Sequence, residues 1–461
     1  MKRRLSLVLC VLLVITSIFS VNVFAQPDGQ TAGASTATAD PVVTQADPND
    51  PFPHLDTILV LDPRTGDVLY EKNADVTRYP ASTTKILTAL LALENCQLDE
   101  QVTVSHAAAS VEGSRIYLME GEVLTVEQML YALLVHSAND AAIALAEHVS
   151  GDVQSFAALM NQRAQELGMV NSHFVTPNGL HDDMHYVTAR DLSLVAVEAM
   201  KNETFRTIVS TYKYEIPPTN LKAESRILYN SNMLLHPSKY YEGIQGIKTG
   251  FTSIAQASLV AQAERNGMRI MAIVMHADRW SMPDNMTAVL NYAYNNFAPV
   301  TIVPAGVVSK QATVKKGSDK KVELQLNEAV NITSAVVNGQ ATADPDAYKY
   351  KVKTDTLIAP VSAGQKGGTL TLYKDGEVIS EYDLYITKDV QLSAFNRFKV
   401  WYKEKVPGFF KAVIIIVVIM ALAYIALMVL VKRKQKKQIK KRQELRAKRA
   451  SRGESEQDRR K

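Results

Sequence analysis

Residues 80–87 read Pro80-Ala81-Ser82-Thr83-Thr84-Lys85-Ile86-Leu87. A proline and small polar residues followed by an apolar run predict the start of a helix. Residues three apart share a helix face, so Ser82 and Lys85 are predicted to meet at its first turn. A serine hydroxyl becomes a nucleophile when a base removes its proton, and a neutral lysine amine can serve. Since a free lysine has a pKa of about 10.4, burial or nearby positive charge must lower it.

The same Ser-x-x-Lys spacing occurs twice more in the chain. Ser210 is followed by Lys213, and Ser318 by Lys321. Neither pair opens an apolar helix, so both are interpreted as surface sequence. The spacing alone is therefore weak evidence for a catalytic pair.

A second polar group, His136-Ser137-Ala138-Asn139-Asp140, interrupts two apolar stretches that predict helices over 126–135 and 141–148. It brings hydroxyl and amide groups to a buried helix junction, although helix capping by Ser137 or Asn139 is the alternative explanation. A third group, Ile247-Lys248-Thr249-Gly250-Phe251, lies on a predicted strand. There Lys248 can supply positive charge, Thr249 can bind a carboxylate, and Gly250 lets a substrate approach the backbone. A strand end with a turn is the alternative.

The flanking patterns predict strands first, helices next, and strands with a helix last. The strands are predicted over 57–61, 68–71, 246–248, 258–261 and 269–275, and the further helices over 85–93, 154–167, 189–200 and 286–297. This order predicts an α+β domain whose sheet is built from both ends of the segment. From residue 298 to about 389, short alternating runs such as 321–326 and 369–373 predict a small β-rich domain.

The three polar groups, in this order, resemble the penicillin-binding proteins and serine β-lactamases. Several segments narrow the resemblance to the low-molecular-mass D-alanyl-D-alanine carboxypeptidases over residues 53–297. They are residues 78–85, Ser137-Ala138-Asn139-Asp140-Ala141-Ala142, Leu167-Gly168-Met169, Pro177-Asn178-Gly179-Leu180, His185-Tyr186-Val187-Thr188-Ala189 and Asn230-Ser231-Asn232-Met233-Leu234-Leu235. The resemblance implies a β-lactamase/transpeptidase-like three-layer α/β/α catalytic domain. It also implies peptidoglycan stem peptides as substrates, β-lactam antibiotics as covalent inhibitors, and no metal or other cofactor.

The resemblance also implies a role for each site residue. Ser82 is acylated, Lys85 accepts its proton, and Ser137 with Lys248 relays a proton to the leaving D-alanine. Asn139 holds the substrate amide, and Thr249 binds the terminal carboxylate in the segment that ends with Gly250 and Phe251. The N–H groups of Ser82 and Phe251 form the oxyanion hole.

Two departures from the family pattern concern the end of this domain. Ala255-Gln256 stands where Ala-Gly is usual. Arg279-Trp280 stands for the usual Arg-Phe, about two residues farther from the closing helix. Arg279 is therefore a candidate for binding the substrate carboxylate, although its sequence position is shifted from the family pattern.

Three alternatives remain open. A β-lactamase of the commonest class uses a Glu-x-x-Leu-Asn element, which is not found between Ser137 and Lys248. A non-catalytic β-lactam sensor would acylate without turnover, but the basic tail offers no evident signalling domain. A zinc peptidase could use His181 and His185, four residues apart, although Asn178-Gly179 favours a turn there.

Two apolar stretches predict an exported protein anchored in the cytoplasmic membrane. Residues 1–25 have basic residues, an apolar core and a small residue at a cleavage site, so they predict a signal peptide, with an uncleaved anchor as the alternative. A flexible leader is predicted over 26–52 and a juxtamembrane segment over 390–410. Residues 411–431 predict a transmembrane helix, because Ala412–Val431 holds 20 residues without a charge. The basic tail, 432–461, is then cytoplasmic and the body lies outside.

The charge distribution argues against nucleic-acid binding by the body. Lys432–Lys461 holds 15 basic and 4 acidic residues, and residues 1–25 hold 3 basic residues. The remaining 33 basic and 43 acidic residues give residues 26–431 a net charge of −10. The body holds one cysteine, Cys96, so a disulfide framework is excluded, and Cys96 is interpreted as a small buried filler.

Overall fold

A five-stranded antiparallel sheet forms the centre of the region that holds the three polar groups. The structure, a computed structural model, describes residues 49–405 and 408–457, so the predicted signal peptide lies outside the described residues. The strand order is β2-β1-β9-β8-β7, and β1 pairs with β9 so that Val60 faces Ala272. The strands are β1 (Thr57–Leu61), β2 (Val68–Lys72), β7 (Ile244–Thr252), β8 (Gln256–Arg265) and β9 (Met268–Ala277). The prediction that both ends of the segment build one sheet is confirmed.

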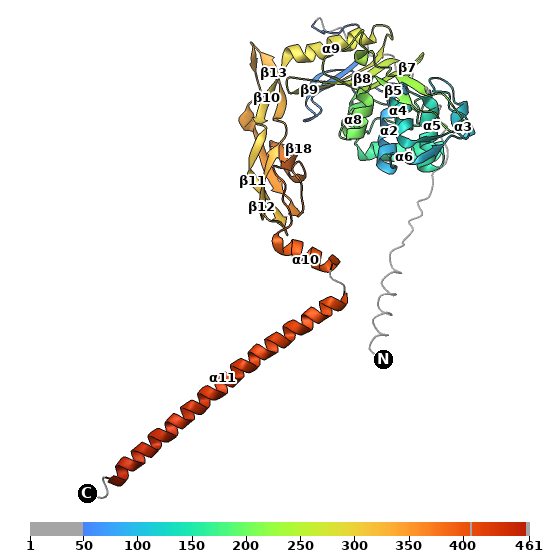
Figure 1. The fold of residues 1–461 in the computed structure, drawn as a ribbon. Coiled ribbons are helices and arrows are strands. Elements are labelled where there is room, and N and C mark those ends of the chain that lie inside the picture. Colours follow the sequence, from blue (N-terminus) through green and yellow to red (C-terminus); the bar gives the residue numbers. More distant parts are fainter. Residues whose placement is uncertain (1–48, 406–407, 458–461) are drawn as a thin grey trace, which may run out of the picture. The chain divides into compact units, whose positions relative to one another are not determined.

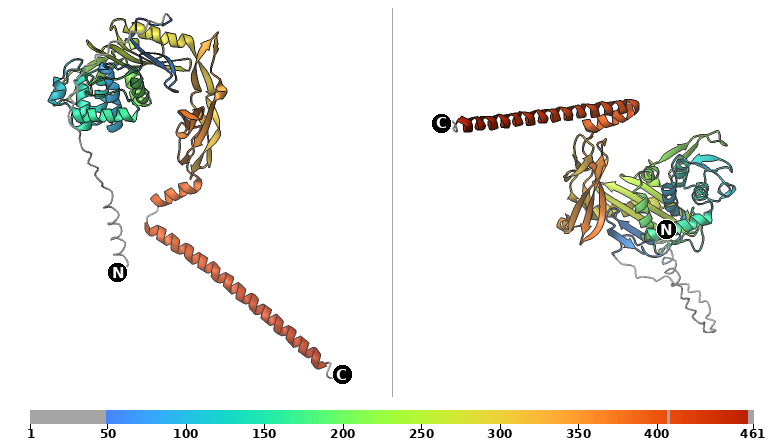
Figure 2. Two further views of the ribbon diagram at one scale, coloured as in Figure 1. Left: turned by 180° about the vertical axis from the view of Figure 1, so that it is seen from behind. Right: turned by 90° about the horizontal axis from the view of Figure 1, so that it is seen from below.

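Helices cover both faces of this sheet. Helix α9 (Met282–Asn296) lies on one face, and a larger helical group lies on the other (Figures 1 and 2). That group contains α2 (Lys85–Asn95), α3 (His106–Ser110), α4 (Val126–Leu134), α5 (Asn139–Ser150), α6 (Val153–Glu166), α7 (Ala189–Ala199) and α8 (Glu203–Ser210). Because both faces are covered, the middle of β9 is apolar without alternation, and Ile270–Met275 is buried throughout. The three-layer architecture is confirmed.

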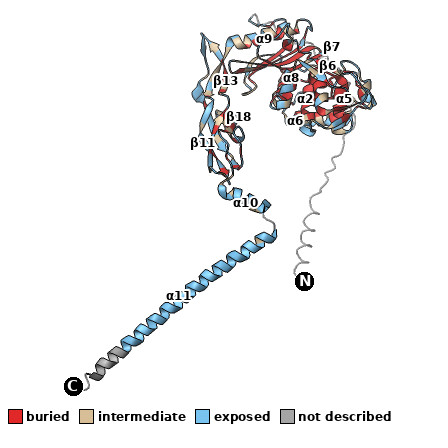
Figure 3. Ribbon diagram, viewed as in Figure 1, coloured by how far each residue is buried: buried red, intermediate tan, exposed pale blue. Residues whose placement is uncertain are grey.

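Helix α2 runs through the centre of the helical layer. It contacts α4, α5, α6 and α7, and Lys85 to Ala92 are all buried. A helix that is apolar all round needs neighbours on every side, which explains its position (Figure 3). The short 3₁₀ turn η1 (Ala81–Thr84) leads into α2, so the end that carries Ser82 and Lys85 is fixed by a buried helix.

Two small two-stranded antiparallel sheets complete this region. The first pairs β3 (Gln101–Thr103) with β4 (Val123–Thr125), and the second pairs β5 (Lys213–Ile216) with β6 (Arg226–Tyr229). A further 3₁₀ turn, η2, spans Met233–Leu235. The sequence patterns did not predict these sheets, because three- and four-residue strands carry too little periodicity.

The region that follows α9 is built from strands, as predicted. Its strands are β10 (Phe297–Val303), β11 (Gly306–Lys315), β12 (Lys321–Leu326), β13 (Val330–Val337), β14 (Gln340–Ala341), β15 (Tyr348–Thr354), β16 (Thr356–Ile358), β17 (Lys366–Lys374) and β18 (Glu377–Ile386), with the turn η3 (Pro345–Ala347). They form sheets of three and six strands around a separate apolar core. The strand predicted over 321–326 is β12, and that over 369–373 lies within β17.

Two helices follow the β-rich domain. Helix α10 is Ala394–Lys405, and α11 is Gly408–Gln457. Within α11, the stretch Gly408–Lys448 contains a window long and apolar enough to cross a membrane. The side chains of that window are not buried by other parts of the chain. The predicted segment 411–431 lies inside this helix.

Candidate active site

The first polar group forms a hydrogen-bonded pair at the start of α2. Lys85 Nζ lies 2.8 Å from Ser82 Oγ, as the three-residue spacing predicts. Ser82 is half-buried and Lys85 is fully buried beneath it. The preceding Ala81 has a φ of +47°, an uncommon conformation for a residue with a Cβ. The serine hydroxyl is thus presented to solvent on a constrained turn, with the amine below it.

The surroundings of Lys85 suit an uncharged amine. Its Nζ lies 2.7 Å from Asn139 Oδ1 and 2.9 Å from the Asn178 carbonyl oxygen. A neutral amine has two N–H groups and one lone pair, so donation to these two oxygens leaves the lone pair facing Ser82 Oγ. Burial, and secondly the charge of Lys248, lowers the pKa of Lys85 well below its ordinary value. The arrangement can therefore accept the serine proton.

The second polar group stands at the N-terminus of α5. Ser137 has a φ of +65°, which turns the chain between α4 and α5. Asn139 begins α5; its Oδ1 accepts from Lys85, and its Nδ2 donates to the Glu112 carbonyl at 2.6 Å. Ser137 and Asn139 are 7% and 4% exposed, so both sit at the edge of the buried interior. The alternative that Ser137 or Asn139 caps the helix does not hold, because the N-cap residue of α5 is Ala138, which makes no side-chain hydrogen bond to the helix.

The third polar group connects the sheet to this junction. Lys248, on β7, places its Nζ 2.9 Å from Ser137 Oγ and 3.0 Å from the Thr249 carbonyl oxygen. Burial lowers the pKa of Lys248 to about 7. The neighbouring Thr249 hydroxyl is half-buried and lies 2.7 Å from Ser231 Oγ. The predicted residues Ser82, Lys85, Ser137, Asn139, Lys248 and Thr249 are thus brought together.

Gly250 allows two parts of the protein backbone to approach each other. A Cβ at this position would lie 2.8 Å from the Pro80 carbonyl oxygen and 3.2 Å from the Ser82 nitrogen. Real Cβ atoms do not come that close to backbone oxygens. The sequence argument assigned the glycine to close approach of a substrate, whereas the close neighbour is the turn that carries Ser82. Gly250 therefore sets the spacing between β7 and the serine.

Arg279 lies beside the end of β7 despite its shifted spacing. Its guanidinium is 4.7 Å from the ring centroid of Phe251 and 5.4 Å from that of Trp280. Phe251 is 44% exposed and Trp280 is 81% exposed, so this group faces solvent. An arginine here adds positive charge at the end of β7, beside the ring of Phe251, which follows Thr249 by two residues.

Residues outside the three groups hold the serine turn in place. Gly179 has a φ of +79°, and a Cβ there would overlap the Ala81 carbonyl oxygen. His185 Nε2 lies 3.0 Å from Thr84 Oγ1, and Thr88 Oγ1 donates to the Pro177 carbonyl at 2.6 Å. The sequence analysis noted the segment around Asn178-Gly179 as family resemblance and as a turn. Its contacts with η1 and α2 had no local sequence signal.

Asp140 fixes the loop on the other side of the site. Its carboxylate oxygens accept from the backbone nitrogens of Ile116 at 3.1 and 3.3 Å and of Leu118 at 3.1 Å. Burial raises the pKa of Asp140 above its ordinary value. Sequence reasoning missed this role, because the partners are 22 and 24 residues away along the chain.

The candidate zinc motif does not form a helical pair of ligands. Residues 181–185 lie in a loop between the Asn178-Gly179 turn and α7. His185 is 2% exposed and makes the Thr84 contact, and burial lowers its pKa to about 4. His181 Nε2 lies 3.3 Å from Asp183 Oδ1 at the surface. The two histidines therefore have separate structural contacts.

A serine nucleophile, an uncharged lysine beneath it and a second lysine on the adjoining strand define a class: the serine acyl-transfer enzymes with the penicillin-binding fold. The profile of D-alanyl-D-alanine carboxypeptidases, Peptidase S11, matches residues 45–279. The profile of the penicillin-binding protein 5 C-terminal domain matches residues 297–392.

The chain is also similar to individual proteins. It is 33% identical to the D-alanyl-D-alanine carboxypeptidase DacF of Bacillus subtilis, over 86% of this chain and 97% of that protein. It is 29% identical to DacC of Escherichia coli, over 74% of this chain and 86% of that protein. The crystal structure of DacD from Francisella tularensis superposes with a TM-score of 0.51 at 27% identity, covering 74% of this chain and 94% of the other. This chain belongs to the D-alanyl-D-alanine carboxypeptidase family. The comparisons favour this function over a β-lactamase or a sensor.

Proposed function

We propose that this chain removes the terminal D-alanine from peptidoglycan stem pentapeptides through an acyl-enzyme on Ser82. The observation that carries the proposal is the placement of Lys85 Nζ, 2.8 Å from Ser82 Oγ and with two carbonyl-type acceptors for its N–H groups. The serine O–H donates to the amine lone pair, and the oxygen attacks the carbonyl carbon of the penultimate D-alanine. Lys85 takes the proton as the new C–O bond forms.

The tetrahedral intermediate collapses when the leaving amine gains a proton. Lys248 and Ser137, 2.9 Å apart, supply that proton, and the C–N bond to D-alanine breaks. The oxyanion is stabilised by the N–H groups of Ser82 and Phe251. Lys85 passes the serine proton back to the Lys248–Ser137 pair, which has given its own proton to D-alanine, so that Lys85 is neutral again. Water then attacks the acyl-enzyme, Lys85 accepts the water proton and delivers it to Ser82 Oγ as the acyl C–O bond breaks, and the shortened peptide leaves.

The substrate carboxylate is the feature that selects a chain end. We assign it to the Thr249 hydroxyl and the Lys248 amine, with Arg279 adding charge from the solvent side. Asn139 binds the substrate amide through its side chain. A β-lactam enters the same pocket and leaves its acyl group on Ser82, where slow hydrolysis traps the enzyme.

Intact mass after exposure to penicillin tests the nucleophile directly. The wild type gains the mass of one penicillin, and Ser82→Ala gains none. Ser210→Ala is the matched control, because Ser210 also stands three residues before a lysine but is exposed at the end of α8. An adduct on Ser82→Ala, or its loss in Ser210→Ala, contradicts the assignment.

Release of D-alanine from a pentapeptide tests turnover. Many turnovers per enzyme are expected, whereas a sensor releases at most one equivalent. Activity is expected to persist in a chelator, since no step uses a metal. Loss of activity with chelator and full activity in Ser82→Ala would favour the zinc alternative.

We also propose the topology and the domain limits. Residues 1–25 are removed as a signal peptide, and residues 26–52 lead to a catalytic domain over 53–297. The β-rich domain of 298–389 and the segment 390–410 precede a membrane span over 411–431, with the tail 432–461 in the cytoplasm. The cluster of lysines and arginines after Val431 supports this orientation. Protease added outside intact cells should remove the catalytic domain and spare an epitope at residue 461.

A further inference from the structure

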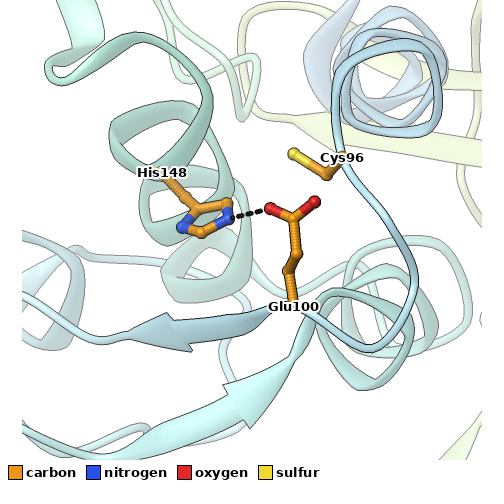
Figure 4. A group of neighbouring side chains, drawn as sticks. All are labelled: Cys96, Glu100 and His148. Carbon is orange, nitrogen blue, oxygen red and sulfur yellow. Dashed lines mark hydrogen bonds and ion pairs between the residues drawn. The ribbon is translucent and has the colours of Figure 1, made fainter.

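Three side chains with metal-binding atoms meet at the opposite ends of the two helices that carry Lys85 and Asn139. Cys96 is the C-cap residue of α2, and His148 lies in the last turn of α5. Glu100, just before β3, completes the group (Figure 4). One ligand atom from each residue lies within 4.8 Å of the other two. None of the three has a role in the acyl-transfer chemistry.

The Glu100 carboxylate is oriented by the backbone as well as paired with His148. His148 Nε2 lies 3.2 Å from Glu100 Oε2, while Glu100 Oε1 accepts from the Gln97 backbone nitrogen at 2.6 Å. The carboxylate is therefore oriented by the backbone, as carboxylate ligands of metals commonly are. The side chains of His148 and Glu100 are 24% and 42% exposed, and Cys96 is half-buried, so an ion can reach the group.

The alternative use of Cys96 as a reactive thiol is disfavoured. Burial, and secondly the charge of Glu100, raises the pKa of its thiol above the ordinary value. Reactive cysteines have depressed pKa values and positive neighbours, the opposite of this environment. Cys96 packs against the apolar core as expected of a small filler, but it is half-buried rather than fully buried, and its sulfur lies near two potential ligands.

We propose that Cys96, Glu100 and His148 form a site for a zinc-type divalent cation. Sulfur, imidazole nitrogen and a single carboxylate together favour Zn²⁺ over Mg²⁺ or Ca²⁺, which prefer oxygen ligands. On binding, the S–H bond of Cys96 breaks, the sulfur bonds the metal, and the proton goes to solvent. His148 Nε2 supplies a lone pair in place of its contact with Glu100, and water takes the fourth position.

The consequence is a clamp between two helices of the catalytic layer. Helices α2 and α5 contact each other, and the site joins their C-terminal ends. A metal that binds only the folded chain stabilises it according to its concentration relative to its dissociation constant. The site lies at the far ends of these helices from Ser82, so the ion affects stability rather than the chemical step.

Cobalt binding to the full-length protein in detergent tests the proposal. Co²⁺ is the probe, because a thiolate ligand gives a sulfur-to-cobalt charge-transfer band, and Zn²⁺ should abolish that band by displacement. One equivalent is expected per chain. Cys96→Ser should abolish the charge-transfer band, and His148→Gln should weaken binding at least about tenfold, since even outer-shell changes cost 10–100-fold. Zn²⁺ should raise the unfolding temperature of the wild type and not that of either variant.

His106→Gln is the matched control. His106 also faces a glutamate, with Nδ1 2.9 Å from Glu120 Oε2, but this pair has no cysteine in the cluster. It should bind Co²⁺ like the wild type. The formation of a penicillin adduct checks that each variant is folded. If Cys96→Ser does not fold, the cobalt affinity of His148→Gln tests the site. No charge-transfer band in the wild type, an unchanged band in Cys96→Ser, or equal weakening by His106→Gln would overturn the site.

Discussion

Replacing Lys248 by methionine should remove a defined part of the pH dependence of stability. Burial lowers the pKa of Lys248 to about 7 from the ordinary 10.5, so between these values the unfolded chain binds a proton that the folded chain does not. Stability therefore rises with pH in that window. From pH 7 to pH 9 the difference in bound protons averages about 0.85, which at 1.36 kcal/mol per pH unit gives about 2 kcal/mol. Lys248→Met keeps most of the length of the side chain and lacks this contribution.

The assay is the unfolding temperature of the catalytic domain in the detergent-solubilised protein, measured at both pH values. For a domain of this size, about 2 kcal/mol corresponds to roughly 4–8 °C. The wild type should gain that much more than Lys248→Met on going from pH 7 to pH 9. Lys213→Met replaces an exposed lysine and should behave like the wild type. An equal gain in wild type and Lys248→Met would refute the claim that burial lowers the pKa of Lys248.

Three further changes probe the site. Gly250→Ala should slow acylation by penicillin and lower the unfolding temperature, because its Cβ would lie 2.8 Å from the Pro80 carbonyl oxygen. Stopped-flow measurement of the acylation rate checks this. Gly408→Ala is the control, because a Cβ there meets no neighbour. Arg279→Ala should raise KM for a pentapeptide about tenfold with little change in kcat, as loss of a charge-assisted contact predicts, and Arg279→Lys should recover part of it. The kcat/KM should fall as pH rises through about 7, because Lys248 must hold a proton to deliver it to the leaving amine. A pH profile of kcat/KM that is flat from pH 6 to 9 would contradict this role.

Long apolar elements of the fold could be predicted from sequence, and short ones could not. Helix α2 was predicted as 85–93 and is Lys85–Asn95, and the strand predicted over 321–326 is β12. In each case the pattern repeats over enough residues to identify its period. The four-residue strand β5 has no such repetition, and it exists because β6 pairs with it. Its stability comes from tertiary contacts, which sequence periodicity does not encode.

The same division applies to the site. The pairing of Ser82 with Lys85 follows from helix geometry, since both residues lie within one turn. The contact of Lys248 with Ser137 spans 111 residues, and only the family resemblance suggested it. At Gly250 the structure adds a neighbour that the sequence argument did not name, the turn that carries Ser82, because a sequence shows that a glycine is needed and not which backbone approaches it. Contacts made across the fold must be seen in the structure.

The two buried lysines divide the acid and base work because the charge of Lys248 acts on Lys85. Desolvation lowers the pKa of both, but the charge of Lys248 lowers that of Lys85 further. A single proton shared by the pair therefore resides on Lys248, which leaves Lys85 uncharged beneath Ser82. A bound substrate carboxylate near Thr249 then holds that proton on Lys248 more strongly. The substrate thus reinforces the protonation state that its own cleavage requires, and a peptide lacking a terminal carboxylate loses this effect together with the binding contact.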